Sequence, residues 1–509
     1  MRTFVPATFI GLLLSAPPLA ARDGGPIAAW IAAHQHELLD EYEAFLRLPN
    51  VATDEAAIRR NAEALVAMME RRGLRPRLLE IDDSAAPPAV YGEWSVPGAT
   101  RTLVLYAHYD GQAVDPAEWT SDPWTPTWRD GRLGDGAREI EREPGDPIDP
   151  DWRLYARSAS DDKAGVFAIL AATDALKSAG SAPAVNLKLF FEGEEEQGSP
   201  HLRSLLERHR EALAADAWVI CDGPVHASGR RQVVFGVRGD ANVDVTVYGP
   251  KRPLHSGHYG NFAPNPALRL ARLLSSMKDA DGRVTIAGWY DDVVPLGDEE
   301  RAALAAVPAD DAALLRDLGL AEPEMRGVSL QEAINQPSLN INGIRAADVG
   351  SQARNVIPTE ARATLDLRLV KGNTVERQFE RLVAHIRAQG YQVLDRAPTD
   401  EERLAHARLA TVVLQPGGYA ASRTPMDLPI ARDVVAAMRT VAGEDLVLMP
   451  TLGGSLPLVV ITEVTGAPTI TIPLANPDNN QHAEDENLRV GNLWDGIVAM
   501  ATVMRLPDD

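Results

Sequence analysis

The spacing of hydrophobic positions divides the chain into stretches of helical and of strand character. From Pro26 to about Arg72 the apolar residues recur at helical intervals, which predicts amphipathic helices. Short apolar runs then alternate with helical stretches as far as residue 220. Strands are predicted at 77–81, 89–92, 101–107, 186–191 and 217–220, and helices at 162–179 and 200–213. This alternation predicts an α/β sheet that helices cover on both faces.

After about Gly236 the pattern changes, because polar and apolar residues alternate at 242–248 and at 363–369. Such alternation is typical of strands in a sheet with one solvent-exposed face. Together with helical stretches at 266–277 and 374–389, it predicts an inserted two-layer α+β domain. The α/β pattern returns after about Met426. The predicted limits are 22–238 and 398–509 for the two parts of the first domain, 239–397 for the inserted domain, and 278–330 for a partly helical insertion within it.

The N-terminal segment resembles a secretory signal peptide. Met1 and Arg2 precede an apolar run from Phe4 to Leu14, and small residues follow up to residue 21. The run is too short to span a membrane, so cleavage near residue 21 and a secreted or periplasmic, soluble protein are expected. A disordered leader is the alternative. Cys221 is the only cysteine in the chain, so a disulfide framework is not expected.

Composition narrows the classes of partner. The chain has 509 residues, with 45% hydrophobic and 24% charged residues, which fits a globular protein of two domains. Its net charge of −22 argues against nucleic acid or an anionic membrane surface as a partner. The charge fits an acidic cleft that binds divalent cations, and equally a general role in solubility.

One acidic stretch stands directly after a predicted buried strand. Four carboxylates follow the apolar residues 187–191 within five positions, namely Glu192, Glu194, Glu195 and Glu196. Gathering them at the edge of a core is unfavourable unless cations or protons compensate their charge. A solvated acidic loop is the simpler interpretation of such a run.

Further acidic residues and histidines follow other apolar runs or open a helix. They are His108, Asp161, Asp222 and His482. Each has an ordinary explanation, such as a helix cap at Asp161, but ligands of open α/β sheets bind beyond the carboxyl ends of the strands. Two histidines and several carboxylates without a thiolate suit zinc, manganese or cobalt. Glu195, next to such a ligand, could accept a proton from bound water.

With these residues the chain resembles the di-zinc exopeptidase family of carnosine-type dipeptidases, glutamate-releasing carboxypeptidases and aminoacylases. The matching stretches run through nearly the whole chain in the order of the family. They are 108–112 (HYDGQ), Trp119 with 122–124 (DPW), 160–165 (SDDKAG), 192–199 (EGEEEQGS), 254–257 (LHSG), 355–358 (NVIP), 453–455 (GGS) and 482–484 (HAE).

The resemblance implies a fold and a set of metal ligands. The fold is a mixed-sheet catalytic domain of the zinc exopeptidase type, interrupted by an inserted α+β lid and dimerisation domain. Two divalent metal ions are expected, zinc first and manganese or cobalt as alternatives. The implied ligands are His108 and Asp222 for one ion, Glu196 and His482 for the other, and Asp161 between them. Asp110 would orient His108, Glu195 would be the general base, and the Asp161–Asp162 peptide would be cis.

The resemblance also implies residues that bind substrate. His255 would reach the active site of the partner subunit and stabilise the oxyanion, although a surface loop histidine is the simpler interpretation. Arg368, Gly453, Gly454 and Ser455 would bind the terminal carboxylate of the substrate, although Arg368 also fits an exposed strand position.

Two positions depart from the pattern of the family. Asn355 replaces a threonine common in the dipeptidases, so the preference for a substrate is open at that position. Ala156-Arg157-Ser158 replaces a frequent Gly-Arg-Gly, which affects the backbone of that loop more than metal ligation.

The sequence therefore predicts an exported homodimeric metallopeptidase that acts on dipeptides or short peptides, as a dipeptidase or carboxypeptidase. A water between the two metal ions would be the nucleophile, with Glu195 as its base. The first alternative is an aminoacylase-like hydrolase of N-acyl or N-carbamoyl amino acids. A non-catalytic binding protein of the same fold is the alternative from another class.

Overall fold

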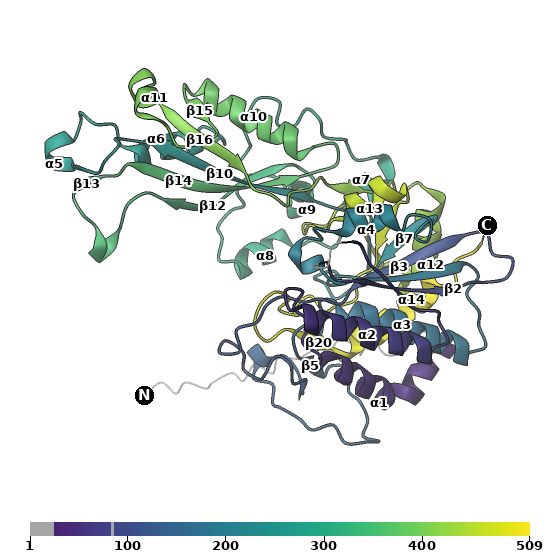
Figure 1. Ribbon diagram of the computed structural model, residues 1–509. Coiled ribbons are helices and arrows are strands. Elements are labelled where there is room, and N and C mark those ends of the chain that lie inside the picture. The colour runs from purple at the N-terminus through teal and green to yellow at the C-terminus, as the bar shows by residue number, and fades with distance from the viewer. Residues whose placement is uncertain (1–24, 83–85, 509) are drawn as a thin grey trace, which may run out of the picture.

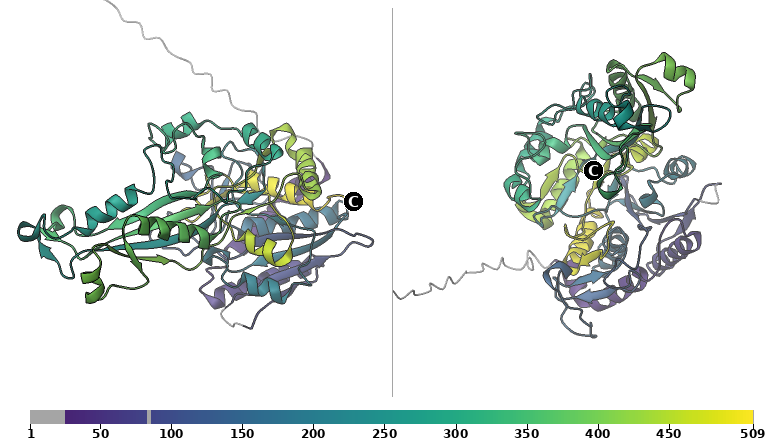
Figure 2. Two further views of the ribbon diagram at one scale, coloured as in Figure 1. Left: turned by 90° about the horizontal axis from the view of Figure 1, so that it is seen from above. Right: turned by 90° about the vertical axis from the view of Figure 1, so that its left-hand side faces the viewer.

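The computed structural model describes residues 25–82 and 86–508, which form two parts with a β-sheet each (Figure 1). One part is rounded, and the other projects from it to one side, as both further views also show (Figure 2). The predicted signal peptide, residues 1–21, lies outside the described residues. No helix in the described ranges has the length and apolar character that crossing a bilayer requires.

The rounded part contains a mixed sheet in the order β1-β2-β6-β3-β7-β19-β8-β18. In the middle, β6, β3, β7 and β19 are parallel neighbours, whereas β1, β2 and β8 each form antiparallel pairs. The strands are β1 (Arg77–Leu79), β2 (Ala89–Trp94), β3 (Thr102–His108), β6 (Asn186–Glu192), β7 (Ala217–Ile220), β8 (Gln232–Val234), β18 (Val447–Met449) and β19 (Thr469–Thr471).

Alternating side chains of these strands form two separate hydrophobic cores. In β3, Leu103 and Leu105 face one core, while Val104 and Tyr106 face the other. Because successive side chains point to opposite faces of a strand, both faces need a cover of helices. One face is covered by α1 (Pro26–Leu46), α2 (Glu55–Arg71), α3 (Lys163–Ser178), α12 (Pro429–Ala442) and α14 (Val490–Val503), and the other by α4 (Leu202–Arg208) and α13 (Leu458–Thr465).

The projecting part is a five-stranded sheet with helices on one face. Its order is β12-β14-β10-β16-β15, antiparallel except for β15 with β16. In β10 buried residues alternate with half-buried ones, as the sequence pattern predicts, and the buried set packs against α6 and α10. The elements are β10 (Gly239–Tyr248), β12 (Ser338–Arg345), β14 (Glu360–Leu369), β15 (Gln392–Leu394), β16 (Leu409–Leu414), α6 (Pro266–Ser275) and α10 (Val375–Ala388).

The predicted fold class, a mixed α/β catalytic sheet with an inserted two-layer α+β domain, is confirmed. The limits 22–238, 239–397 and 398–509 stay predictions. The strand pairing shows that β16 belongs to the five-stranded sheet although it lies beyond residue 397.

The segment between α6 and β12 contacts both parts of the molecule. It contains α7 (Asp298–Ala306), α8 (Asp311–Asp317) and α9 (Leu330–Ile334). Its Asp292 pairs with Arg381 of α10 at 2.7 Å, while Glu300 pairs with Arg423 of the rounded part at 3.4 Å. The predicted partly helical insertion therefore links the two sheets.

Three small sheets complete the structure. The pair β11–β13 lies with α5 at the far tip of the projecting part (Figure 1). The sheet β20-β5-β4 brings the C-terminal region next to the loop that precedes α3. Their elements, with the remaining ones, are α5 (Ser256–Tyr259), α11 (Asp400–Ala405), β4 (Thr127–Arg129), β5 (Arg153–Tyr155), β9 (Gly236–Val237), β11 (Leu254–His255), β13 (Val356–Ile357), β17 (Ser422–Arg423) and β20 (Asn487–Arg489).

Candidate metal centre

Predicted ligands that end or follow the four parallel central strands lie at one edge of the sheet. His108 ends β3, Glu195 and Glu196 follow β6, Asp222 follows β7, and His482 lies in the loop after β19. Because these strands are parallel neighbours, their carboxyl ends meet at one edge, where ligands of such sheets bind.

Asp161 lies at the centre of this group and divides its two carboxylate oxygens between two histidines. Its Oδ1 is 3.0 Å from Nε2 of His108, and its Oδ2 is 3.1 Å from Nε2 of His482. Glu196 is 3.4 Å from His482, and Asp222 is 3.9 Å from His108. These are the residue pairs that the resemblance implied, with Asp161 between them, and their role as metal ligands stays a prediction.

The donor atoms form two adjacent groups in which carboxylate and imidazole atoms lie within 4.8 Å of one another. The second group is Asp161, Glu196 and His482, as expected, whereas the first contains Asp162 beside His108 and Asp222. Asp162 is the less suitable ligand, because its carboxylate caps α3 at Gly165 and accepts the amide of His108. Asp161 has no such commitment of its oxygens, so we assign it to both groups.

The pKa values of the cluster reflect its burial and its excess of carboxylates. Burial, followed by the charge of Asp161, raises the pKa of Glu196 to about 8. Burial likewise raises the pKa of Asp222 to about 6. The hydrogen bond to Asp161 raises the pKa of His482 to about 9. At His108 burial acts against the charged ring, but hydrogen bonds to Asp110 and Asp161 still raise its pKa.

The protein alone thus holds protons in this cluster near neutral pH. Divalent cations bind such sites by replacing protons on histidine and carboxylate ligands. Two imidazoles, three carboxylates and no thiolate are a donor set that suits zinc, manganese or cobalt. The residues present therefore fit two divalent ions that share Asp161.

Asp110 fixes both His108 and the acidic loop. Its Oδ1 lies 3.3 Å from Nδ1 of His108, which agrees with the predicted orienting contact. The same carboxylate accepts the backbone amides of Glu195, at 3.1 Å, and of Glu196, at 3.0 Å. One buried carboxylate therefore positions a histidine, the predicted base and a carboxylate ligand.

The four glutamates after β6 have different surroundings. Glu195 is 3.8 Å from Nε2 of His108 and its side chain is 12% exposed, and burial raises its pKa well above the ordinary value. Glu192 is buried and accepts the hydroxyl of Tyr106, and burial raises its pKa to about 7. Glu194 accepts the backbone amide of His201 at 2.8 Å. Glu192 and Glu194 are thus structural groups beside the centre.

The loop that presents Asp161 has two unusual backbone features. The Asp161–Asp162 peptide is cis, as the resemblance implied. Ser158 has a φ of 61°, a left-handed conformation that favours glycine. It is the position at which the family often has the second glycine of Gly-Arg-Gly, and here its hydroxyl accepts a hydrogen bond from Asn50 at 3.0 Å.

Two of the predicted substrate-binding residues meet at the junction of the two parts. Nη1 of Arg368 donates to Oγ of Ser455 at 2.9 Å, and its Nε donates to Asp366 at 3.0 Å. Gly453 and Gly454 directly precede Ser455, and a Cβ at Gly454 would meet no atom within 4 Å. The loop therefore has open space at Gly454, next in the chain to the residue that Arg368 contacts.

Charges on both sides of this junction act on the phenol of Tyr419. Its pKa is raised by burial and by the charges of Asp240 and Glu195, while the charge of Arg368 acts in the opposite direction. A single phenol is therefore influenced both by the predicted base and by the predicted carboxylate-binding arginine.

His255 and Asn355 are not brought to the metal cluster of their own chain. His255 precedes α5, and its ring lies tilted against that of His258 with the centroids 4.7 Å apart, while Asn355 directly precedes β13. Both are exposed at the tip of the projecting part, far from β3 and β6 (Figures 1 and 2). Within one chain the tip contributes nothing to the cluster.

Sequence reasoning missed three residues around the centre. Gln112 donates to Glu196 at 2.7 Å, and its place in the HYDGQ stretch was the signal that could have found it. Tyr419 had no signal, because it lies in a loop without a motif. Glu486 is buried beside Asp161, four residues after His482, and its acidic neighbours Glu484 and Asp485 hide it in the sequence.

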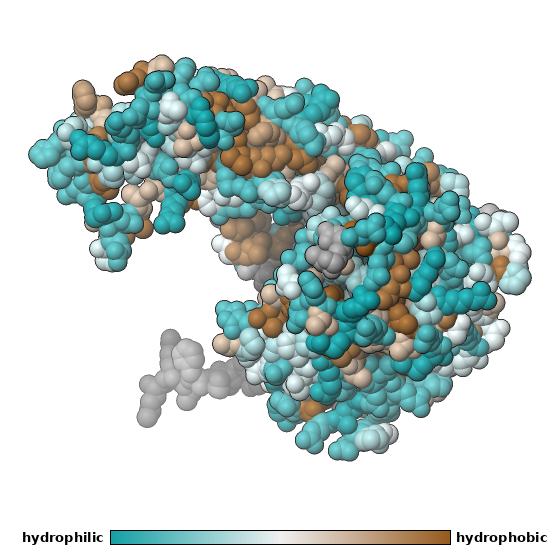
Figure 3. All heavy atoms as spheres, viewed as in Figure 1, coloured by the Kyte–Doolittle hydropathy of each residue, from teal (hydrophilic) through white to brown (hydrophobic). Residues whose placement is uncertain are grey.

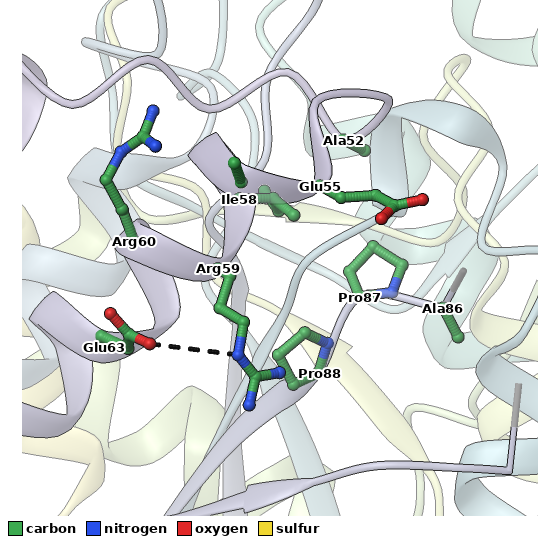
Figure 4. A pocket seen from close by; sticks show the side chains of 10 residues that line it. Ala52, Glu55, Ile58, Arg59, Arg60, Glu63, Ala86, Pro87 and Pro88 are labelled. Carbon is green, nitrogen blue, oxygen red and sulfur yellow. Dashed lines mark ion pairs between the residues drawn. The ribbon is translucent and has the colours of Figure 1, made fainter. Parts of the chain in front are cut away.

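A pocket of about 430 Å³ lies away from this cluster, at the start of α2 (Figure 4). Arg59 and Arg60 both line it, and Arg59 pairs with Glu63 at 3.9 Å and with Glu80 at 2.8 Å. Its described lining shares no residue with the metal cluster, so the cluster remains the candidate site.

Comparison with known proteins identifies relatives over most of the chain. The sequence profile of peptidase family M20/M25/M40 matches residues 104–506. The Cys-Gly metallodipeptidase of Schizosaccharomyces pombe is 26% identical over 447 residues, which are 86% of each chain. The human Beta-Ala-His dipeptidase is 26% identical over 422 residues, 82% of this chain and 76% of that protein. A structure of an M20 family metallo-carboxypeptidase from Sulfolobus solfataricus superposes with a TM-score of 0.73 at 26% identity, covering 92% and 99% of the two chains.

These findings confirm the resemblance inferred from the sequence and the prediction of a metallopeptidase-type hydrolase, and they correct another prediction. The prediction of a secreted or periplasmic location is wrong, because the similarity to Cys-Gly and Beta-Ala-His dipeptidases contradicts it. The predicted signal peptide itself lies outside the described residues. A short apolar run after a basic residue was too unspecific a pattern to establish export.

Proposed function

The chain belongs to peptidase family M20/M25/M40, and from this premise we propose that it uses two divalent metal ions to hydrolyse dipeptides. The observation that carries the proposal is the position of Asp161, whose two oxygens lie 3.0 and 3.1 Å from the histidines of two ligand groups. Relatives named as dipeptidases support the class of substrate. Longer short peptides, and action as a carboxypeptidase, are the wider form of the same proposal.

The ions would be held by His108 and Asp222 on one side and by Glu196 and His482 on the other, with Asp161 shared. Zinc is the proposed ion, and manganese and cobalt suit the same donors. When bound, such ions would polarise the scissile carbonyl and lower the pKa of a bound water molecule.

Glu195 is the proposed general base. Its carboxylate lies 3.8 Å from the ring nitrogen of His108 that faces the cluster, and its backbone is held by Asp110. From this position it accepts the proton of the attacking water and returns it to the leaving amine. The burial that raises its pKa also makes it a stronger acceptor for that proton.

Arg368 and Ser455 are the proposed site for the free carboxylate of the substrate. A guanidinium forms two parallel hydrogen bonds with a carboxylate, and the loop 453–455 adds backbone amides and a hydroxyl. The contact of Arg368 with Ser455 joins the two parts of the molecule at this point. The substrate would therefore lie between the sheet edge and the projecting part, where the surface is openly hollowed (Figure 3).

We propose that the projecting part pairs two copies of the chain through β12. This strand is the edge of its sheet, and its residues 340–345 are all exposed. Unpaired edge strands form backbone hydrogen bonds with another chain readily. Exposed apolar side chains accompany it, with Ile344 61% and Val349 83% exposed.

A second copy would also explain the position of His255 and Asn355. Both lie at the tip, beyond reach of the cluster in their own chain (Figure 1). In a symmetric dimer each tip could enter the open hollow of the partner, where an imidazole and an amide can donate hydrogen bonds to an oxyanion.

An assay of the variant Glu195→Gln tests this function. With Ala-Ala as substrate we expect kcat to fall about 10²- to 10⁴-fold, since general base catalysis contributes about that factor. Metal content should stay at two ions per chain. Unchanged turnover with both ions bound would contradict the role of Glu195.

The parent chain should be assayed in parallel on N-acetyl-alanine and N-carbamoyl-alanine. The carboxylate site suits these substrates equally, so the geometry alone does not separate them from dipeptides. Higher kcat/KM on the acylated amino acids than on Ala-Ala, Cys-Gly and β-Ala-His would replace the dipeptidase proposal with an amidohydrolase.

A further inference from the structure

We infer that Glu486 is a positioning residue that holds the loop of Asp161 and the loop of His482 in one fixed arrangement. Its side chain is fully buried, yet it lies outside both ligand groups. The inference rests on the proposed function, because it concerns how the chain shapes the proposed metal centre.

Five hydrogen bonds end on the carboxylate of Glu486, and all come from the segment 157–161. Oε1 accepts the backbone amide of Asp161 at 2.9 Å, the amide of Ser160 at 2.8 Å and the hydroxyl of Ser160 at 2.9 Å. Oε2 accepts the amide of Ser158 at 2.9 Å and Nη1 of Arg157 at 2.7 Å. The backbone amides of Ser158, Ser160 and Asp161 are thus fixed by one side chain, at and directly before the shared ligand.

The same residue is tied to the histidine loop by the chain and by Arg157. Glu486 stands four residues after His482, and Nη2 of Arg157 donates to the carbonyl of Ala483 at 3.1 Å. Arg157 also stacks over the ring of Trp119 at 5.1 Å. The ion pair of Arg157 with Glu486 therefore connects both ligand loops through buried atoms.

Strand pairing explains why Glu486 reaches this position. It directly precedes β20, which pairs antiparallel with β5 in the register Asn487 with Tyr155. The carbonyl of Glu486 accepts the amide of Ala156 at 3.1 Å, which extends the pairing by one step. The loop 157–161 leaves β5 at this point and folds back over the carboxylate.

This arrangement matters for a metal centre because ligands must stay close to their ideal positions. Sites that tolerate errors of only about 0.5 Å need groups behind the ligands to hold them. Replacing such an outer partner typically weakens metal binding about 10- to 100-fold. Glu486 fixes the backbone of a ligand that both ions would share, so its loss should affect both.

The variant Glu486→Gln is the direct test, with cobalt(II) chloride alone as the probe. The amide keeps the size of the side chain but offers an NH₂ group where an oxygen now accepts hydrogen bonds. Glu484→Gln is the matched control, because Glu484 is exposed in the same loop and carries the same charge. Cobalt affinity and stoichiometry would be measured by calorimetry and by the visible absorption of the bound ion, and folding by circular dichroism.

We expect the parent and Glu484→Gln to bind two cobalt ions alike, and Glu486→Gln to bind them about 10- to 100-fold more weakly with an unchanged fold. With saturating cobalt, the loss in kcat on Ala-Ala should largely recover and KM should change little. A merely structural role would lower the melting temperature and leave cobalt affinity unchanged, and that result would overturn the inference.

If Glu486→Gln does not fold, Ser160→Ala decides the question. It removes one of the five hydrogen bonds and leaves the buried charge in place. We expect cobalt binding about three- to tenfold weaker, which corresponds to one hydrogen bond, and unchanged binding would overturn the inference. A parent chain that binds no cobalt would instead contradict the proposed function.

Discussion

The edge of the central sheet and the tip of the projecting part both hold residues expected to act on substrate, but they are built in opposite ways. At the sheet edge His108 and Asp222 are almost fully buried, and the two ring nitrogens of His108 lie 3.3 Å from Asp110 and 3.0 Å from Asp161. At the tip His255 and Asn355 are exposed, and the nearest ring to His255 is that of His258.

The difference indicates which parts of the site a single chain forms by itself. One chain assembles the sheet edge, because four parallel strands and the loop before α3 bring its groups together, and Asp110 and Glu486 fix backbone at that edge. The tip offers an exposed imidazole and an exposed amide, without a second protein surface around them. We therefore expect the two regions to respond differently to mutation, to dilution and to pH.

Asp161→Asn should break the sheet edge most severely. The amide lacks the charge and one of the two oxygens that now face His108 and His482. We expect the affinity for both metal ions to fall by more than about 100-fold, the loss that replacing a residue behind a ligand causes. Dipeptide hydrolysis should be lost with the metal. Metal per chain by mass spectrometry checks this, with Glu484→Gln as the control. Two retained ions would contradict the shared ligand.

Mixing two defective variants should show whether the tip acts on another copy. His255→Ala alone should lose about 10²- to 10³-fold in kcat if it stabilises an oxyanion, with its metal content unchanged. Mixed with Glu195→Gln under conditions of subunit exchange, it should regain about a quarter of the parental activity, since half the dimers carry one complete site. Activity that stays at the mean of the two variants would contradict a shared site.

Ile344→Asp should weaken the pairing of copies through β12. An isoleucine buried on association contributes about 1.5–3 kcal/mol, so the dissociation constant should rise about tenfold or more. Leu404→Asp is the matched control, because Leu404 is 90% exposed on α11, near the opposite edge of the sheet. Analytical ultracentrifugation measures both, and equal dissociation constants would remove β12 from the interface.

The smallest effect is expected from pH. In the metal-free protein the pKa of His482 is raised to about 9 from an ordinary 6.5, so its stabilising contribution is present below pH 6.5 and is lost as pH rises to 9. The pKa of Glu196 is raised from 4.5 to about 8, so its contribution to stability likewise falls as pH rises from 4.5 to 8. Because the side chain of His482 is 55% exposed, solvent screening reduces its contribution to stability.

The melting temperature of the metal-free protein should therefore fall by a few degrees between pH 6.5 and 9. The stabilisation by added zinc should rise over the same range, because the metal needs deprotonated ligands. Differential scanning fluorimetry with a chelator and with zinc measures both slopes. Parallel slopes would contradict the assignment of these two residues as ligands.

The sequence predicted much of the sheet edge because its signals are local. His108 and Asp222 end or directly follow strand-like runs, Asp161 opens a helix, and Glu196 and His482 lie in the loops after two further runs. The parallel order of the strands then brings these positions to one edge. The supporting residues were harder to foresee. Glu486 is distinguished from exposed Glu484 only by the pairing of β20 with β5, which links residues far apart in the chain.

The projecting part was predicted less completely for a different reason. The alternation in β10 and β14 is regular, whereas β12 is interrupted between Ile341 and Gly343, where the register shifts as in a β-bulge. The apolar run 409–414 of β16 has no such period, and it lies beyond the expected limit of the inserted domain. In the rounded part, helix α13 was difficult to predict as well, because it consists mostly of β-branched and apolar residues that favour a strand, and packing against α4 overrides that preference.

Zinc titration of the metal-free chain, with Ala-Ala hydrolysis followed at each step, tests the central claim most directly. If two zinc ions share Asp161, activity should rise with bound zinc and level off at two ions per chain. The variant Asp161→Asn should bind no pair of ions and show no such rise in activity. Saturation of activity at one ion, or hydrolysis by the chain without metal, would contradict a di-metal dipeptidase.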